Sequence, residues 1–354
     1  MWHTCSFIDS YSHTPLVEFT LSNSEVKESN LDSLVKIGRS CDSVELFEFK
    51  NNLYVLGCST DGRFRVWDAN SCSNIFTHVY NESQCISVFQ CKDYIVTINT
   101  RGIIVRYDKN KLLKPEFTTD VDVCNCGTTA LFQSGCVDGD TFYALGKSSV
   151  YKYDCTTNTS TILFNTVNNI KICTCENLIV LFSISCVSVF NSHGECLINF
   201  KDDSISIINC DNNQIFIGQG AYLNTFEIYE NNLIPKASCT TTTLCNIKVI
   251  SKIFCNRFIM FTTEYSNYIY LCDISNNYTM PFVYFETNDR EINSISAGVS
   301  DNKLILCIGT LISENCYNYS KSFPIEAPYR INLNNVFNLY KIMEKTGIRF
   351  SNMK

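Results

Sequence analysis

Cysteine and histidine are the residue types in this sequence with the greatest capacity for chemistry. The chain has 21 cysteines and 4 histidines among its 354 residues, and no Cys-x-x-Cys occurs. A single residue separates Cys124 from Cys126, and likewise Cys173 from Cys175. Because side chains alternate between the two faces of a strand, the two thiols of such a pair would share a face. A zinc site needs four ligands, and the histidines form no ligand pattern with these pairs. We therefore predict no metal and no cofactor, and interpret the cysteines as small apolar residues of strand cores.

Patterns for other kinds of catalysis are also missing from the sequence. It contains neither a phosphate-binding Gly-rich loop nor a Gly-x-Ser-x-Gly elbow. His193 lies in an expected turn, where a lone histidine is usually a solvated residue rather than a general base. Asp202 and Asp203 are adjacent in another expected turn, so their carboxylates would point apart. We expect no enzyme, although composition alone does not exclude a Ser/His/Asp arrangement.

Composition restricts the compartment and the partners. The chain is 45% hydrophobic and has 28 basic against 35 acidic residues, which is enough for a core and argues against coating nucleic acid. No apolar stretch of about 18 residues exists, so we predict no membrane insertion. The first residues lack the basic and apolar regions of a secretory signal. We expect an intracellular protein, cytoplasmic or nuclear, with free thiols, and neither nucleic acid nor a small molecule as its direct ligand.

A repeated hairpin is the structural element that would position any functional side chains of this protein. Residues 53–68 read as two strands around an Asp-Gly turn, ending in Trp67-Asp68. Similar hairpins end in Tyr107-Asp108 and Tyr153-Asp154, and weaker copies follow. Seven acidic or amide positions close the copies, at 68, 108, 154, 191, 230, 273 and 318. Their spacing of about 42 residues is the period of a propeller blade.

The hairpins resemble the WD-repeat family of β-propellers. The repeat signature is carried by an Asp-Gly turn and by aromatic-acid pairs, namely Asp61, Gly62, Trp67, Asp68, Tyr107, Asp108, Tyr153, Asp154 and Asp273. In that family, a His from a Gly-His pair bonds to the turn Asp and onward to a Ser/Thr and the Trp. This chain has no Gly-His dipeptide, and six of its seven units lack the Trp. We therefore expect the hydrogen-bonded tetrad to be absent or incomplete in every blade.

The resemblance predicts an all-β fold, a single seven-bladed propeller of four-stranded blades over residues 40–325. An apolar run before most hairpins would be the innermost strand. We expect residues 1–39 to hold a ring-closing strand at about 15–21, added to the blade of Leu304 and Tyr317. Residues 326–354 would be an appendage with a short C-terminal helix over 334–345. Its apolar face would comprise Val336, Leu339, Tyr340 and Met343, for packing on the rim or for docking a partner.

The resemblance implies a non-catalytic scaffold that binds other protein subunits in an intracellular complex. Two alternatives remain, a propeller enzyme of the esterase kind and a non-catalytic subunit of an RNA-modifying methyltransferase. Phosphoinositide-binding propellers rely on a Phe/Leu-Arg-Arg-Gly motif, and this chain has no Arg-Arg pair. An enzyme would require a cluster of polar residues at the centre or on one face of the ring, with a His or carboxylate of shifted pKa.

Overall fold

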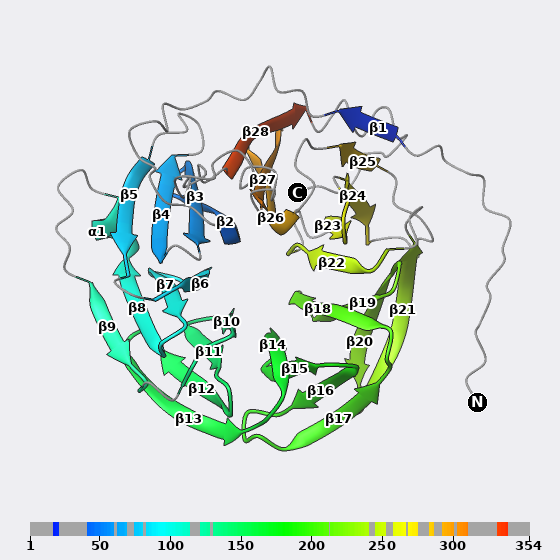
Figure 1. Cartoon of the computed structure of the whole chain (residues 1–354), viewed down its shortest axis with the longest axis horizontal. Coiled ribbons are helices and arrows are strands. Elements are labelled where there is room, and N and C mark those ends of the chain that lie inside the picture. Colours follow the sequence, from blue (N-terminus) through cyan, green and yellow to red (C-terminus); the bar gives the residue numbers. More distant parts are fainter. Residues whose placement is uncertain are drawn as a thin grey trace, which may run out of the picture.

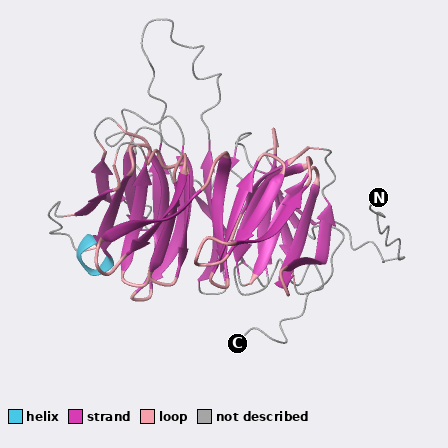
Figure 2. Ribbon diagram, turned by 90° about the horizontal axis from the view of Figure 1, so that it is seen from below, coloured by secondary structure: helices cyan, strands magenta, loops and turns pink. Residues whose placement is uncertain are grey.

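The computed structural model describes fifteen segments of the chain. They are residues 17–20, 41–59, 62–68, 74–80, 83–113, 121–127, 130–211, 213–240, 245–252, 258–266, 268–274, 283–286, 292–300, 303–310 and 331–338. Seven sheets are formed within them, arranged around a common centre (Figure 1). Edge-on, the strands form one thick disc with turns on both faces (Figure 2). None of the helices in these segments is long and apolar enough to cross a bilayer.

Six of the sheets each contain four strands that follow one another along the chain, and the sixth of them also holds a fifth strand from near the N-terminus. The first three comprise β2 (Cys41–Phe49), β3 (Asn52–Ser59), β4 (Arg63–Asp68) and β5 (Asn74–Val79); β6 (Cys85–Gln90), β7 (Tyr94–Asn99), β8 (Ile103–Asp108) and β9 (Asp122–Asn125); and β10 (Ser134–Asp138), β11 (Thr141–Leu145), β12 (Ser149–Asp154) and β13 (Thr159–Asn165). One helical turn, α1 (Lys109–Leu112), follows β8.

The next three sheets repeat this plan. They comprise β14 (Asn169–Cys175), β15 (Leu178–Ser183), β16 (Cys186–Phe190) and β17 (Cys196–Lys201); β18 (Ile205–Asp211), β19 (Gln214–Gln219), β20 (Tyr222–Tyr229) and β21 (Asn232–Thr240); and β22 (Ile247–Ile250), β23 (Phe258–Thr263), β24 (Tyr268–Asp273) and β25 (Val283–Glu286). The last sheet has three strands, β26 (Ile292–Ser300), β27 (Lys303–Thr310) and β28 (Ile331–Asn338).

Within each four-stranded sheet we name the strands a, b, c and d from the centre outwards. The first strand of each sheet lies nearest the centre in Figure 1, so the innermost strands are those expected from the sequence. The b strands are buried on both faces, as in β23, where all six residues are buried. A strand between two packed layers reads as a continuous apolar run. The d strands are more exposed, and in β13 four of the seven residues are exposed and none is buried.

The two faces of the disc differ in the turns that form them. Antiparallel order places every b–c turn on the same face as the connection from strand d to the next sheet. Backbone bonds join the two: Tyr80 N donates to Gly62 O at 2.7 Å, Thr166 N to Ser148 O at 3.0 Å, and Asp202 N to the carbonyl of Ser185 at 2.9 Å. We call this the bc face. The opposite face carries the a–b and c–d turns.

The ring closes differently from the sequence prediction. Strand β1 (Val17–Thr20) exists, but it pairs in parallel with β25, as Val17 opposite Val283. The expectation that it joins the sheet of Leu304 is therefore wrong. That sheet instead takes β28 beside β27, with Val336 opposite Ile305. The free edge of β27 needs a partner strand for its backbone groups, and residues 331–338 supply it.

The strand β28 also corrects the C-terminal prediction. The helix expected from residue 334 is not formed at 334–338, and Val336 is a strand residue. Residue 325 consequently does not end the sheet region, since 331–338 belong to the last sheet. The other predicted helix residues (Leu339, Tyr340 and Met343) and the expected strand at 316–318 lie outside the described residues.

Candidate functional site

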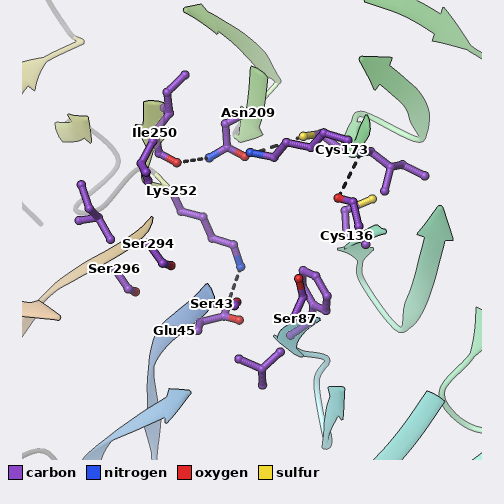
Figure 3. A pocket seen from close by; sticks show the side chains of 18 of the residues that line it. Ser43, Glu45, Ser87, Cys136, Cys173, Asn209, Ile250, Lys252, Ser294 and Ser296 are labelled. Atoms are coloured by element: carbon purple, nitrogen blue, oxygen red, sulfur yellow. Dashed lines mark hydrogen bonds and ion pairs between the residues drawn. The ribbon is translucent and has the colours of Figure 1, made fainter. Parts of the chain in front are cut away.

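A central channel runs between the innermost strands of the seven sheets. It encloses about 1080 Å³ of empty space, part of it open to solvent, and residues of β2, β6, β10, β14, β18, β22 and β26 line it. Serine hydroxyls, amides, thiols and lysine side chains face it (Figure 3). The wall of the channel thus combines these polar groups with apolar side chains of the same strands.

An ion pair crosses the channel. The Lys252 ammonium lies 2.6 Å from a carboxylate oxygen of Glu45, joining the end of β22 to β2 (Figure 3). The Glu45 side chain is 8% exposed, whereas that of Lys252 is 60% exposed to the open channel. The surrounding channel wall partly desolvates the Lys252 ammonium, which opposes its charge. The charge and hydrogen bond of Glu45 outweigh this effect and raise the pKa of Lys252. The Lys252 ammonium thus neutralises the charge of the nearly buried Glu45 carboxylate.

Side chains of the innermost strands also link neighbouring sheets. Ser294 and Ser296 of β26 accept hydrogen bonds from backbone amides of β2, at 3.0 and 2.9 Å, which joins the last sheet to the first. The Asn209 amide donates to the carbonyls of Ile250 and Ser251, at 3.1 and 2.9 Å. These bonds satisfy backbone groups that an innermost strand edge would otherwise leave unpaired.

Three thiols lie on one side of the channel, Cys136, Cys173 and Cys210. A hydrogen bond with Cys210 and the charge of Lys171 lower the pKa of Cys173, although burial opposes this shift. Burial raises the pKa of Cys210 and of Cys136 well above the ordinary value. No group of three metal-ligating side chains with suitable geometry occurs among the described residues. Cys173 and Cys210 thus share a hydrogen bond at the channel wall, and Cys136 lies beside Cys173.

Three aromatic residues of the predicted repeat signature lie in the buried parts of the hairpins. Trp67, Tyr107 and Tyr153 are buried in the third strands of the first three sheets, with at most 3% exposure. Gly62 adopts a φ of 79° in the first b–c turn. Asp61 lies outside the described residues, Asp68 is half-buried at the end of β4, and Asp273 ends β24 opposite Phe258.

The remaining two signature carboxylates stabilise turns. Asp108 caps α1 by accepting hydrogen bonds from the backbone amides of Asn110 and Lys111, at 2.8 and 3.3 Å. Asp154 accepts bonds from the Thr156 hydroxyl and amide, which lower its pKa to about 2. The acidic residue that closes these hairpins therefore organises the turn that follows.

A buried network of three hydroxyl groups lies at the second sheet. The Tyr80 hydroxyl bonds to the Thr97 hydroxyl and lies 3.0 Å from that of Tyr107. Tyr80 lies in the connection before β6, Thr97 on strand b and Tyr107 on strand c. The network therefore links the connection before the second sheet to the two buried strands of that sheet. The sequence predicts only that the tetrad is absent or incomplete, and it gives no signal for this network.

Exposed apolar side chains gather on the bc face, in the turns of three successive sheets. Ile184 is 81% exposed in the β15–β16 turn, Tyr222 is 52% exposed at the start of β20, and Tyr265 is 85% exposed in the β23–β24 turn. Val167, in the connection before β14, is 70% exposed. Ile170 and Ile184 also line a shallow hollow on this face. We call Val167, Ile170, Ile184, Tyr222 and Tyr265 the apolar arc.

Comparison with solved structures identifies the ring. The β-propeller domain of Myceliophteria thermophila Cps50 (Swd1) superimposes with a TM-score of 0.61, at 11% identity, over 78% of this chain and 98% of that chain. This protein is a β-propeller. No protein-family model matches the sequence, and no curated protein matches it.

Two further propellers are similar in fold. KlHsv2 with loop 6CD replaced by a Gly-Ser linker gives a TM-score of 0.56 at 8% identity, covering 76% of this chain and 89% of that chain. The computationally designed Ika8 protein gives 0.55 at 12% identity, covering 77% and 94%. At these identities the likeness shows the fold and, through Hsv2 and Swd1, a structural similarity to WD40-like propellers.

The two described histidines of the propeller lie away from its channel. The His78 ring packs on those of Tyr80 and Tyr107, with centroids 4.7 and 5.7 Å apart, and burial lowers its pKa. His193 is exposed in the β16–β17 turn, and its backbone amide donates to the Asn191 side chain. Of the residues described along the channel wall, none is a histidine.

The channel ion pair gives a prediction about stability. Lys252→Met is expected to lower the free energy of unfolding by about 1–2 kcal/mol, because the nearly buried Glu45 carboxylate loses its cation. The expected loss is smaller than for a fully buried ion pair because solvent screens the exposed Lys252 side chain. Urea unfolding monitored by tryptophan fluorescence measures it. The matched control is Lys236→Met, whose partner Glu227 lies 2.7 Å away on the surface, and it should change stability by less than about 0.5 kcal/mol.

Adding Glu45→Gln to Lys252→Met should recover part of the loss, since the uncompensated charge is then removed. Equal effects of Lys252→Met and Lys236→Met would contradict this account of the channel.

Proposed function

We propose that this propeller is a non-catalytic, WD-repeat-like scaffold with seven blades, which binds other protein subunits of an intracellular complex. The three-stranded sheet β26–β28 would be the seventh blade. Its bonds to β2 support a closed ring, because Ser294 and Ser296 reach the first sheet. A rigid ring holds its turns in fixed relative positions, and such turns are where binding residues concentrate.

The observation that carries the proposal is the apolar arc on the bc face. Tyr265 is 85% exposed and has a φ of 56°. A bulky residue in the left-handed region costs stability, and its exposed ring recovers none of that by burial in the chain itself. Binding sites are enriched in such outliers, and tyrosine is a frequent hot-spot residue of protein interfaces. A partner that buries Tyr265 and Ile184 would offset the cost.

The partner we propose is a protein rather than a nucleic acid, a membrane or a small molecule. Large apolar side chains on a polar surround are the usual pattern of a protein interface, whereas nucleic-acid sites are dominated by Arg and Lys. The apolar arc extends over three sheets, so it offers a broad surface instead of an enclosed pocket. The cytoplasm or nucleus is the proposed location, in line with 15 described cysteines that are all free.

Affinity purification of the tagged full chain from its native source tests the proposal. Mass spectrometry should find at least one other protein in stoichiometric amount with it. A chain that purifies as a stable lone monomer under gentle conditions would contradict the proposal. Measurable esterase activity of that monomer would favour the enzyme alternative instead.

A further inference from the structure

Three pairs of buried cysteine thiols lie unusually close to one another. Their sulfur–sulfur distances are 2.7 Å for Cys58 and Cys85, 2.9 Å for Cys91 and Cys155, and 3.0 Å for Cys239 and Cys272. All six residues are at most 5% exposed. Heavy atoms without a bond usually settle about 3.5–4.0 Å apart. The two sulfurs of each pair are therefore already inside ordinary contact distance.

Each pair joins two neighbouring sheets of the ring. The elements concerned are β3 with β6, the turn after β6 with the turn after β12, and β21 with β24. The linked positions are 27, 64 and 33 residues apart in sequence. The blades pack on one another through side chains, with no backbone ladder between them. A covalent link at these points would fasten two blades that are otherwise joined by side-chain packing and hydrogen bonds.

Proximity of this kind is not shared by every thiol in the described part of the chain. Cys124 and Cys126 both bond to the Ser160 hydroxyl, at 3.4 and 3.1 Å. Cys186 bonds to the Asn199 side chain at 2.7 Å, and the exposed Cys196 bonds to the carbonyl of Ile198 at 3.4 Å. These thiols have oxygen partners, and Cys124 and Cys126, which also bond to each other, belong to a single sheet. The three pairs with a short sulfur–sulfur distance instead join different sheets.

We propose that Cys58–Cys85, Cys91–Cys155 and Cys239–Cys272 are sites of disulfide formation, which staple adjacent blades when the chain meets a disulfide oxidant. The same pairs stay reduced in a thiol-rich compartment. Covalent closure requires the sulfurs of each pair to approach by only about 1 Å.

The chemistry is thiol–disulfide exchange with a low-molecular-weight disulfide such as glutathione disulfide. One cysteine loses its proton and attacks the oxidant, forming a mixed disulfide and releasing one glutathione thiolate. The second cysteine, also deprotonated, then attacks the protein sulfur of that mixed disulfide and releases the other glutathione thiolate. The protein loses two electrons and two protons for each link, and one glutathione disulfide becomes two glutathiones.

Burial determines when these links can form and break. The hydrogen bond with Cys91, together with burial, raises the pKa of Cys155 well above its ordinary value, which disfavours the attacking thiolate in the closed ring. Exchange should therefore be fast while the blades are still docking and slow once the ring is packed. Formed links would be protected from reductants for the same reason.

Peptide mapping of the full-length wild-type chain tests the proposal. The reduced, unfolded chain is refolded with glutathione and glutathione disulfide, remaining thiols are blocked with maleimide in denaturant, and linked peptides are identified by mass spectrometry. We expect the three predicted links, each with a loss of about 2 Da for the two hydrogen atoms removed. The oxidised chain should also melt roughly 5–15 °C higher than the reduced chain.

Two variants separate specific links from general oxidation. Cys85→Ala should abolish the link to Cys58 and leave the other two in place, while Cys196→Ser should retain all three. The mapping of the wild-type chain decides the question even if Cys85→Ala fails to fold. Complete maleimide labelling of all six cysteines after oxidative refolding, or links that mainly join other cysteines, would overturn the proposal.

Discussion

Replacement of Gly62 by alanine is expected to lower the free energy of unfolding by about 3 kcal/mol. Gly62 has a φ of 79°, a conformation that costs an L-residue about 1–2 kcal/mol. An added Cβ would also lie 2.5 Å from the Ser83 carbonyl oxygen and 2.8 Å from that of Tyr80. Both atoms belong to backbone, so relief requires the connection to the next sheet to move, at a further cost of about 1–3 kcal/mol.

Gly139→Ala is the matched control for this prediction. Gly139 also has a positive φ, of 59°, but a Cβ there would meet nothing within 4 Å. Its substitution should cost only about 1 kcal/mol, the backbone part of the effect. Urea unfolding of both variants compares them directly. Equal losses would mean that the b–c turn does not pack beneath the connection between sheets as the structure shows.

Replacement of Tyr107 by alanine is expected to lower the free energy of unfolding by about 3–5 kcal/mol, the usual range for removing a buried aromatic ring. Tyr107 is 1% exposed, and its ring lies 4.9 Å from that of Phe64 and 5.8 Å from that of Phe76, across two sheets. Tyr107→Phe retains this packing and removes only the hydroxyl. It should cost about 1 kcal/mol, because Tyr80 keeps its bond to Thr97.

The buried hydroxyl network also predicts a dependence on pH. Burial raises the pKa of Tyr107 well above 10.0, and burial likewise raises that of Tyr80. Phenols in the unfolded chain ionise near pH 10, whereas these two stay protonated in the folded chain. Their contribution to stability is therefore complete below pH 10 and declines as the pH rises above it.

Comparison of Tyr107→Phe with the wild type isolates this contribution among the 19 tyrosines of the chain. Urea unfolding at pH 8 and at pH 10.5 should show a smaller loss of stability for Tyr107→Phe than for the wild type. Parallel losses in the two proteins would contradict the burial of the Tyr107 hydroxyl.

The hairpins could be predicted from sequence because their signals are local. Turns such as Asp61-Gly62 and runs such as 94–98 and 103–108 define two strands within about 16 residues. The structure confirms the resulting order, with an apolar strand at the centre followed by two buried strands, as β6, β7 and β8 show. The spacing of the repeats and the pattern of apolar residues along each strand were sufficient to predict this part of the fold.

Ring closure could not be predicted because it depends on which sheet edge is free. Residues 17–20 read as a strand, but nothing in their sequence distinguishes β25 from the last sheet as a partner. Residues around 336 fit a helical spacing, and residues 331–338 serve as a strand. The backbone groups at the edge of β27 favour the strand, and sequence patterns carry no information about such a distant edge.

The hydroxyl network and the thiol pairs were missed for a related reason. Tyr80 and Thr97 are 17 residues apart, and Cys91 and Cys155 are 64 apart, so only docking of blades brings them together. Reading the cysteines as core residues is supported for the buried ones, such as Cys58 and Cys272. Their pairing across blades depends on the angle between sheets, which a one-dimensional repeat does not contain.

The apolar arc makes the scaffold proposal directly measurable. The decisive experiment repeats the affinity purification with Ile184→Ser/Tyr265→Ser and, as control, with Tyr229→Ser. Tyr229 is 64% exposed and lies at the c–d turn of β20, on the opposite face. Both proteins should fold like the wild type, because neither change removes a buried side chain. Quantitative mass spectrometry then compares the partner recovered per chain.

We expect the double variant to lose its stoichiometric partner by at least about 30-fold, which corresponds to roughly 2 kcal/mol of binding energy from two hot-spot residues. The Tyr229→Ser protein should retain its partner at the wild-type level. Equal recovery of the partner by all three proteins would contradict the central claim that the bc face is the binding surface of this propeller.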